Sequence, residues 1–403
     1  MTLPQSLTPL FKSWRMALLL AISLAALFWL QPSSPVRGLQ MAVPLASLLM
    51  TVLVWLLCYK GMGQLSQPRS LNIVVAVIVG LFVLLKTEAL TQGLSAALRA
   101  INGQNTSQAA ASDVMWLGFS YIAFRLIHVL RDKASGRLPA LNLPEFVTYV
   151  LFAPTLLAGP IDRAERFAKE LRATFKPNWP DLLAGGQRLF IGAFKKFALA
   201  DTLALIALNE HNASQATSAW GAWLLVYAYA LRLYFDFSGY SDMAIGAARL
   251  VGLKLPENFN APYLKPNLTV FWNNWHMTLS QWFRAYWFNP LSRWLRGRQL
   301  STPTMILICQ SSTMLLIGLW HGITWNFVAW GAWHAVGLFS HNRWADFAKQ
   351  REWVLEGRAQ QLAAVAGAIA TFHFVALGWV WFALPSLALS WQVLGRLLGM
   401  PLG

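Results

Sequence analysis

The sequence predicts an all-α, polytopic membrane protein, and three observations lead to this prediction. Of the 403 residues, 56% are apolar and only 12% are charged, whereas soluble domains have about 25% charged residues. The apolar residues gather in runs of about 15–20, close to the length of a helix that crosses a bilayer. The 32 lysines and arginines outnumber the 16 acidic residues. In an apolar chain this excess indicates cytoplasmic loops and lipid headgroups rather than nucleic acid, and the basic residues are spread through the loops without forming a patch.

The N-terminal part predicts four membrane spans, at residues 16–30, 39–58, 71–85 and 114–130. The first run resembles a signal peptide in its length and basic flank. However, no convincing small-x-small cleavage site follows it and the second span begins almost at once, so we predict a retained helix. Basic residues are more frequent before span one, between spans two and three and after span four than in the alternate loops. The positive-inside rule therefore predicts a cytoplasmic N-terminus.

From residue 140 onward the pattern is less regular. Residues 146–158 are apolar for only 13 residues and end in Ala-Gly-Pro-Ile-Asp-Arg at 158–163, which favours a broken or re-entrant helix over a full crossing. Arg163, Arg166, Lys169 and Arg172 recur about once per helical turn, and we interpret them as a basic face at the headgroup boundary. Further apolar stretches bring the prediction to roughly ten or eleven helical elements. These stretches cover residues 183–209, 218–235, 303–320, 324–340 and 362–384.

Two histidines are candidates for chemistry because apolar and aromatic residues enclose them. His321 follows Trp320 and lies between Gly318 and Gly322, which would allow a close approach to the backbone. A neutral imidazole suits proton abstraction near pH 7, although this local pattern alone favours a packing histidine. His276 lies in a tryptophan-rich stretch, residues 271–290, which is typical of an interfacial helix. That interpretation explains the tryptophans but not the polar side chains among them.

Helical spacing predicts the neighbours of these groups. At 100° per residue, one helical face carries Trp272, His276, Leu279 and Phe283, with Asn273, Ser280 and Arg284 close by. Upstream, the apolar span 218–235 is expected to continue into a polar turn that carries Asp236 and Asp242. Because these carboxylates are six residues apart, they do not share a helical face, and we interpret them as helix-terminus or supporting residues. No metal-ligand spacing and no glycine-rich phosphate loop is present in the sequence.

With these residues in view, the chain resembles the membrane-bound O-acyltransferase (MBOAT) family. The resemblance rests on five blocks that occur in order within residues 146–338, nearly half of the chain. The blocks are Ala-Gly-Pro-Ile-Asp-Arg at 158–163, Tyr-Phe-Asp-Phe-Ser-Gly-Tyr-Ser at 234–241, Pro-Glu-Asn-Phe-Asn-Ala-Pro-Tyr at 256–263, Phe-Trp-Asn-Asn-Trp-His at 271–276 and Leu-Trp-His-Gly at 319–322. One block would be weak evidence, whereas five in order within a polytopic chain are strong evidence.

The resemblance implies transfer of an acyl group from a thioester to a hydroxyl group. His321 matches the position of the family's catalytic histidine and would act as general base. His276 matches the second characteristic polar site and would orient a substrate or stabilise the oxyanion. Supporting or substrate-binding roles are predicted for Trp320, Asn273, Trp275, Ser280, Arg284, Asp236 and Tyr240. The implied fold is a ring of tilted, partly broken helices around a central tunnel. Residues 1–140 would form N-terminal helices, 141–345 the catalytic core and 346–403 C-terminal helices of one membrane domain.

Within the family, the chain resembles a bacterial branch of inner-membrane proteins. These proteins modify glycopolymers outside the cytoplasm. The D-alanine-transfer (DltB-type) proteins share its length and Gly-Pro-Ile-Asp-Arg, which slightly favours them. The alginate and cellulose acetylation (AlgI-type) proteins share Phe-Asp-Phe-Ser-Gly-Tyr-Ser-Asp-Met-Ala at 235–244 but usually carry Pro-Leu-Gly-Gly where this chain has Pro-Leu-Ser-Arg at 290–293. The Asn273-Asn274 pair stands where a basic residue is common. Both subtypes stay open, and so does a proton-coupled transporter, which would also use intramembrane histidines.

The resemblance also implies partners. The donor would be the phosphopantetheine thioester of an acyl carrier protein, or acetyl-CoA, arriving at the cytoplasmic face. No permanently bound cofactor, no metal and no nucleic acid is expected. Whether a periplasmic acyl-transfer protein completes the reaction is left open by the sequence. The excess of basic residues in the cytoplasmic loops would help an acidic donor to dock.

Overall fold

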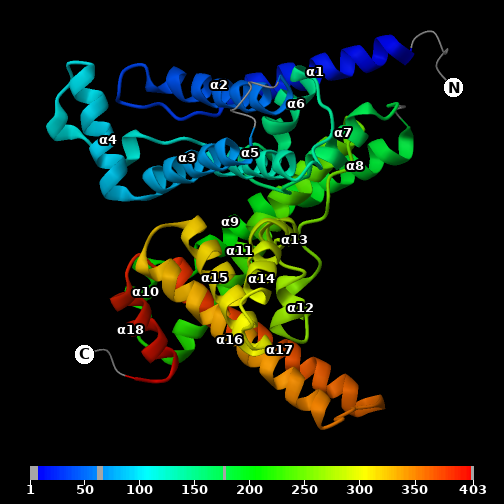
Figure 1. Cartoon of the computed structure of the whole chain (residues 1–403). Coiled ribbons are helices and arrows are strands. Elements are labelled where there is room, and N and C mark those ends of the chain that lie inside the picture. Colours follow the sequence, from blue (N-terminus) through cyan, green and yellow to red (C-terminus); the bar gives the residue numbers. More distant parts are fainter. Residues whose placement is uncertain (1–7, 61–66, 176–177, 401–403) are drawn as a thin grey trace. The chain divides into compact units, whose positions relative to one another are not determined.

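The computed structural model describes residues 8–60, 67–175 and 178–400. Within these ranges every regular element is a helix, from α1 (Thr8–Trp29) to α18 (Leu387–Leu397), which confirms the predicted all-α fold (Figure 1). The eighteen α-helices of the described ranges are more numerous and shorter than the ten or eleven elements predicted, because several apolar stretches are divided. The chain forms two compact units. The first comprises residues 1–190 and 241–256, and the second comprises 191–240 and 257–403.

The first unit contains the helices of the N-terminal half. They are α1, α2 (Leu39–Tyr59), α3 (Pro68–Lys86), α4 (Glu88–Ile101), α5 (Phe119–Ala134), α6 (Leu143–Val150), α7 (Ala164–Arg172) and most of α8 (Trp179–Ala193). The short helix α6 packs against both α1 and α2. All of its last six residues are buried, and Phe146 belongs to the apolar core of this unit. A helix of eight residues cannot cross a bilayer, so α6 serves as core.

The segment after α6 is broken, as the sequence predicted. A 3₁₀ turn (Ala153–Thr155) follows α6, and the chain runs without a helix to α7. Its backbone carbonyls need partners, because irregular backbone away from water must be hydrogen-bonded within the protein. The buried guanidinium of Arg125, from α5, donates to the carbonyls of Val150 (2.7 Å) and Thr155 (2.6 Å). Arg125 therefore fixes the end of α6 and the 3₁₀ turn that follows it.

Two of the four basic residues predicted to form a headgroup face on α7 are paired within the protein. Arg166 forms an ion pair with Asp162 of the Gly-Pro-Ile-Asp-Arg block, and its Nε lies 2.6 Å from the carboxylate. Arg172 pairs with Glu145 of α6 at 2.7 Å. Two of the four basic residues thus tie α7 to neighbouring segments, because carboxylates from outside the helix neutralise them. Spacing along one helix could not reveal these partners.

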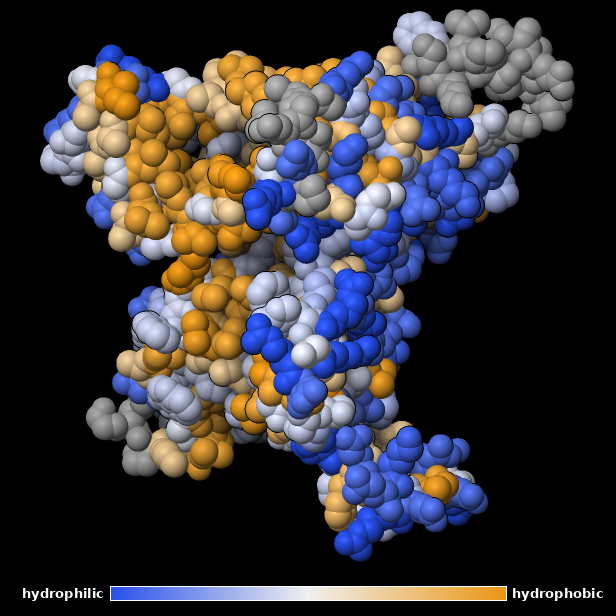
Figure 2. Space-filling model, in the orientation of Figure 1, coloured by the Kyte–Doolittle hydropathy of each residue, from blue (hydrophilic) through white to orange (hydrophobic). Residues whose placement is uncertain are grey.

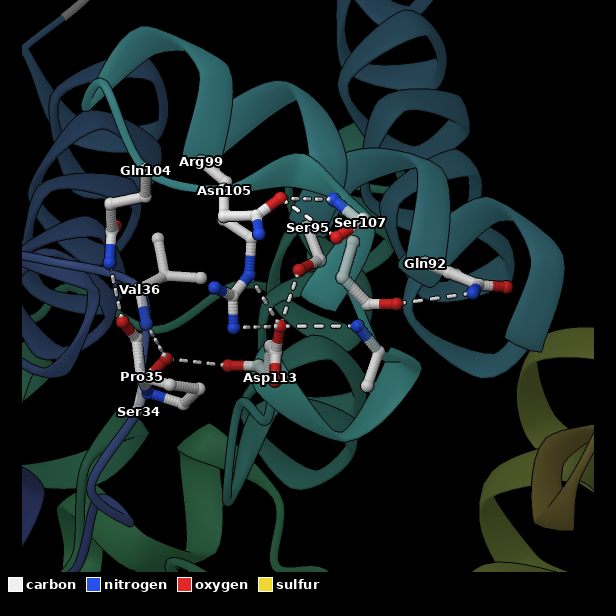
Figure 3. Close-up of polar contacts among 12 residues, drawn as sticks. Ser34, Pro35, Val36, Gln92, Ser95, Arg99, Gln104, Asn105, Ser107 and Asp113 are labelled. Carbon is white, nitrogen blue, oxygen red and sulfur yellow. Dashed lines mark hydrogen bonds and ion pairs between the residues drawn. The ribbon is translucent and has the colours of Figure 1, made fainter.

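Helix α4 lies in the polar stretch between the third and fourth predicted spans, where no helix was expected. Its residues Ser95 and Arg99 bind the carboxylate of Asp113 at 2.6 and 3.0 Å, and the backbone N–H of Ala110 donates to the same oxygen (Figure 3). Burial opposes ionisation of Asp113, but these hydrogen bonds outweigh it and lower the pKa of Asp113. The carbonyl of Asp113 accepts a hydrogen bond from Ser34 at 2.7 Å. The network therefore joins the loop before α2 to the loop before α5.

The second unit holds the C-terminal helices. They are a π-helix (Phe194–Ala200), α9 (Asp201–Ala204), α10 (Glu210–Gln215), much of α11 (Ala219–Leu250), α12 (Leu268–Trp272), α13 (Met277–Phe283), a second π-helix (Arg284–Phe288), α14 (Asn289–Arg296), α15 (Thr302–His321), α16 (Trp325–Gln350), α17 (Gly357–Ala383) and α18. Helices α15 and α16 form a closely packed hairpin. A side chain at Gly318 would approach the carbonyl oxygen of Phe327 to 2.3 Å, so glycine is required there.

Helix α11 corrects one prediction. It runs unbroken from Ala219 to Leu250, so Asp236 and Asp242 lie in its middle and not in a polar turn. Each carboxylate is neutralised by a cation from the preceding helical segment: Lys196 for Asp236 and Arg188 for Asp242, the latter at 2.8 Å. A charged side chain is tolerated inside an apolar helix when a partner from another element neutralises it, and the sequence pattern of one helix does not show that partner.

Four helices among the described residues are long and apolar enough to cross a membrane. They are Leu39–Tyr59, Arg69–Lys86, Thr302–His321 and Gly357–Ala383. Large apolar side chains of α2 and α3, such as Met41, Leu49, Ile73 and Val77, are exposed, and hydrophobic surface gathers over these helices in Figure 2. The far end of the α16–α17 hairpin is hydrophilic in the same view. Exposed apolar faces of this kind suit contact with lipid, as the predicted membrane protein requires.

Candidate active site

His276 occupies a break in the tryptophan-rich segment. The segment forms two short helices, α12 and α13, and His276 lies between them with a left-handed φ of 39°. The prediction of one continuous helical face from Trp272 to Phe283 is therefore wrong. A non-glycine residue in this conformation is strained and needs surrounding structure to hold it. Such strain is often found at functional sites.

Asn258 holds the break in place. Its carbonyl oxygen accepts from the backbone N–H of Met277 at 2.9 Å, and its side-chain oxygen accepts from the hydroxyl of Thr278 at 2.9 Å. Asn258 is fully buried, so the loop 256–263 fixes the start of α13 and with it the direction of His276. This loop is one of the blocks that carry the family resemblance, but no role was predicted for Asn258. A buried asparagine in a loop was the available signal.

The imidazole of His276 is enclosed by aromatic rings. It is 2% exposed, meets Phe237 of α11 edge-on with ring centroids 4.6 Å apart, and lies 6.1 Å from Trp320. Burial, together with the nearby His321, holds the pKa of His276 well below its ordinary value. His276 lies outside the four candidate spans, and it is neutral at physiological pH. A neutral imidazole can donate one hydrogen bond and accept another.

His321 is the last residue of α15. Its ring contacts Trp320 and Phe382 with centroid distances of 4.5 and 4.7 Å, and it stacks with Phe327 at 5.9 Å. The next residue, Gly322, has extended backbone, and a Cβ there would lie 2.6 Å from the Phe327 ring. The close approach predicted at Gly318 and Gly322 is confirmed, and the approaching group in both cases is Phe327. Helix packing therefore sets the position of His321.

The structure brings the two predicted catalytic residues together. Trp320 contacts both histidine rings, and the proximity of His321 contributes to the lowered pKa of His276. Phe237, Trp330 and Phe382 complete an aromatic enclosure around the pair. His276 and Trp330 are buried in it, whereas His321 and Trp320 are half-buried. We call this group, with His276 and His321 at its centre, the histidine site.

A cavity of about 190 Å³ lies beside the tryptophan-rich segment. Three of the predicted supporting residues line it: Asn273, Ser280 and Arg284. Arg284 donates to the side-chain oxygen of Asn273 at 2.5 Å. Ser280 donates to the backbone carbonyl of Trp272 at 3.1 Å. The remaining lining residues are Thr269, Trp272, Phe288, Gln310, Thr313, Met314, Ile317 and Leu338.

Gln310 and Thr313 of α15 are cavity residues that were not predicted from sequence. Both are polar residues inside the apolar stretch 303–320, and that position was the only available signal. The described structure thus gives the cavity polar groups on two walls, one from the segment around α12 and α13 and one from α15. These two walls meet only in the folded chain, so no single stretch of sequence shows them.

The other predicted supporting residues lie elsewhere. Trp275 is buried in an aromatic cluster, with its ring 5.2 Å from Trp379 and stacked on Phe271 at 5.6 Å, so packing is its evident role. Asp236 is ion-paired with Lys196 in the middle of α11, and Tyr240 follows it one turn later on the same helix. Lys196 belongs to the first π-helix and was missed, because it lies within the apolar stretch 183–209.

This fold and site define an integral membrane enzyme, in which two histidines lie in an aromatic enclosure beside a polar cavity. A family model described as "MBOAT, membrane-bound O-acyltransferase family" matches residues 43–377. The chain belongs to the membrane-bound O-acyltransferase family. This match confirms the acyltransferase class that the five sequence blocks predicted, and it sets aside the transporter alternative.

The names of several curated relatives each specify a polymer and the acyl group that is transferred or the reaction type. The chain is 34% identical to "Teichoic acid D-alanyltransferase" of Bacillus subtilis over 275 residues, which are 67% of this chain and 69% of that protein. It is 36% identical over 279 residues to "Probable alginate O-acetylase AlgI" of Azotobacter vinelandii, covering 69% and 52%. It is 31% identical over 284 residues to "Peptidoglycan O-acetyltransferase" of Helicobacter pylori, covering 67% and 52%. The match thus spans about half of the two O-acetyl-transferring relatives.

Proposed function

We propose that this protein transfers a short acyl group, D-alanyl or acetyl, from a cytoplasmic thioester to a hydroxyl group of an extracytoplasmic glycopolymer or of its lipid or protein intermediate. The observation that supports it most is the proximity of His276 to His321 in the histidine site, because the resemblance assigns these two residues to the family's characteristic positions. The relatives named as D-alanyl and O-acetyl transferases support the acyl class and the envelope polymer as acceptor.

The reaction can be written with these two histidines. The neutral imidazole of His321 accepts the proton of the acceptor hydroxyl while that oxygen attacks the thioester carbonyl carbon. The carbonyl oxygen becomes an oxyanion, and an N–H of the neutral His276 ring would donate a hydrogen bond to it. The carbon–sulfur bond then breaks as the carbonyl re-forms. The leaving thiolate takes the proton from His321, which returns to its neutral form with the ester complete.

The aromatic enclosure supports this assignment in a second way. Water can also attack the thioester and hydrolyse it. Acyl transfer therefore requires that the acceptor hydroxyl reach the thioester carbonyl carbon before water does. Rings of Phe237, Trp330 and Phe382 surround the histidines, and exclusion of water suppresses such side reactions. The neutral state of His276 also spares the site a buried positive charge, which would be costly to hold there.

The proposal includes the location and the partners. The protein would lie in the bacterial inner membrane with its N-terminus in the cytoplasm, where the donor, an acyl carrier protein or acetyl-CoA, is found. The basic loops between spans support this orientation. A periplasmic protein could receive the acyl group before the polymer does. The mass of the acyl group that base releases from the envelope distinguishes the D-alanyl from the acetyl form of the proposal.

Substitution of His321 is the direct test. We expect His321→Ala to abolish formation of base-labile acyl ester in the envelope, because no other group replaces the general base, while membrane insertion and protein level stay normal. The ester is measured by mass spectrometry after mild alkaline release. His211→Ala is the matched control, because His211 is exposed on α10. Wild-type ester levels in His321→Ala would refute the proposed mechanism.

A further inference from the structure

His276 stands at a position whose side chain usually caps a helix. It is the N-cap residue of α13, and an N-cap side chain normally accepts a hydrogen bond from the second or third backbone N–H of its helix. The first N–H groups of a helix have no partner within the helix, so they need acceptors from elsewhere. The His276 side chain makes no cap hydrogen bond, and its Nε2 has no hydrogen-bond partner among the described residues. The start of α13 is therefore capped by another residue.

Asn258 supplies the missing acceptors from a different segment. Its backbone carbonyl accepts from the N–H of Met277, the first residue of α13, at 2.9 Å. Its side-chain oxygen accepts from the backbone N–H of Thr278 at 3.3 Å and from the hydroxyl of the same residue at 2.9 Å. Both Asn258 and Thr278 are buried. Asn258 thus makes the hydrogen bond that the side chain of an N-cap residue would otherwise make.

The same loop also binds the chain on the other side of His276. The backbone N–H of Asn260 donates to the carbonyl of Asn274 at 3.1 Å. Hydrogen bonds to one loop therefore fix the backbone two residues before His276 and one residue after it. Ala261, in this loop, is left-handed with a φ of 42°, as His276 is at 39°. Such a conformation persists in residues other than glycine only where surrounding contacts determine it, and these hydrogen bonds are contacts of that kind.

Capping by Asn258 leaves the imidazole of His276 available. A histidine that capped its own helix would use a ring nitrogen as the acceptor, and a neutral imidazole has only one acceptor nitrogen. The ring would also be held against the first turn of α13. Instead it lies edge-on to Phe237 and 6.1 Å from Trp320, whose ring also contacts His321. The capping residue therefore affects which groups the His276 ring can contact.

We propose that Asn258 is a positioning residue for acyl transfer: it caps α13 in place of His276 and thereby leaves the His276 imidazole free to act beside His321. This proposal rests on the proposed function, in which His276 takes part in the reaction. Asn258 has no contact with the reacting groups in this assignment, and its effect passes through His276. Loss of Asn258 should therefore slow the reaction only while His276 is present.

The test is a double-mutant cycle between these two residues. It measures the rate of base-labile ester formation per amount of protein in membranes that contain the full-length variants, together with the Tm of each variant in detergent. We expect Asn258→Ala to slow ester formation roughly tenfold, close to the effect of His276→Ala. The double variant should be no slower than His276→Ala alone, because residues that act through one another have non-additive effects.

Thr278 offers a milder change if Asn258→Ala prevents folding. Thr278→Val removes the hydroxyl that donates to Asn258 and should slow ester formation in the wild-type background but not in the His276→Ala background. Thr278→Ser keeps the hydroxyl and should restore the rate. The matched control is Asn209→Ala, which removes the asparagine cap of α10, where the Asn209 side chain accepts from the N–H of Asn212 at 2.8 Å. This control should form ester at the wild-type rate.

Three results would overturn the assignment. The first is a wild-type rate in both Asn258→Ala and Thr278→Val. The second is full additivity of either change with His276→Ala, which would show that its effect does not pass through His276. The third is equal slowing in Asn209→Ala, which would show that loss of any helix cap has the same effect. The acyl transfer itself is tested separately by His321→Ala in the same membranes, so failure of the two proposals can be distinguished.

Discussion

At the scale of single residues, the chemistry depends on how His276 is held. Its backbone is left-handed, Asn258 fixes the residues after it, and aromatic rings cover its side chain. A strained conformation inside a buried site is maintained only by its surroundings. The ring therefore has little freedom to turn away from His321, and the two imidazoles are organised before substrates arrive.

The role of His276 can be separated from that of a packing residue. We expect His276→Ala to slow acyl transfer roughly tenfold or more, since a positioned hydrogen-bond donor contributes at least that much. His276→Asn should recover part of the loss, because asparagine tolerates the left-handed conformation and keeps an N–H donor. The rate of ester formation in membranes decides the question. Equal rates for His276→Ala and wild type would reduce His276 to a structural role.

Asp113 provides a pH-dependent test outside the candidate spans. Burial opposes its ionisation, but hydrogen bonds from Ser95, Ala110 and Arg99 hold its folded-state pKa below the value of about 4 in an unfolded chain. Its contribution to stability is then complete above about pH 4 and is lost as the pH falls through the lowered pKa. We expect Asp113→Asn to lower the Tm at pH 6, and the difference from wild type to shrink below about pH 4. A difference that grows in acid would contradict this.

At the scale of elements, the α15–α16 hairpin positions His321. Gly318 and Gly331 let the two backbones approach closely, since a side chain at either would come within 3 Å of a carbonyl oxygen on the other helix. The packing of small residues is a common way for membrane helices to associate. His321, the proposed catalytic base, therefore lies at the closed end of a hairpin whose two helices cannot separate without unpacking these contacts.

This hairpin predicts the effect of a small substitution. We expect Gly318→Ala to destabilise the protein by roughly 1–3 kcal/mol, because the new methyl group would overlap the carbonyl oxygen of Phe327. Acyl transfer should fall with it, since His321 follows one turn later. The Tm in detergent is the measurement. Gly80→Ala in α3 is the control, because a methyl group at Gly80 would meet no described atom within 4 Å, and it should be neutral.

At this scale, local signals in the sequence reveal some elements, and contacts between distant segments conceal others. The blocks around His276 and His321 were identified from sequence, and so was the break after residue 150, because glycine, proline and short apolar runs are local signals. Helix α4 was missed since its polar residues face partners, such as Asp113, that lie in another segment. The turn expected at Asp236 was wrong because Lys196 neutralises that charge. Cavity residues Gln310 and Thr313 depend on which helices meet, and that is a property of the fold.

At the scale of the whole molecule, orientation in the membrane is the prediction that most needs a test. The excess of basic residues in alternate loops predicts that the loop around Thr106 faces outward and the loop around Ser135 faces the cytoplasm. Both residues are exposed, whereas the native Cys58 and Cys309 are buried. We expect a membrane-impermeant maleimide to label Thr106→Cys in intact cells and to label Ser135→Cys only after lysis. The reverse pattern would invert the proposed topology.

The division between the cavity lining and the two histidines suggests how this family could have diversified. Proton transfer is proposed for His276 and His321, whereas the cavity is lined by other residues, from Ser280 and Ile317 one turn away to Arg284 and Thr313 about two turns away. Substitutions in the cavity could therefore exchange one substrate for another without disturbing the reacting groups. Such a modular arrangement offers a physical reason why relatives of similar identity carry names for three different polymers, teichoic acid, alginate and peptidoglycan.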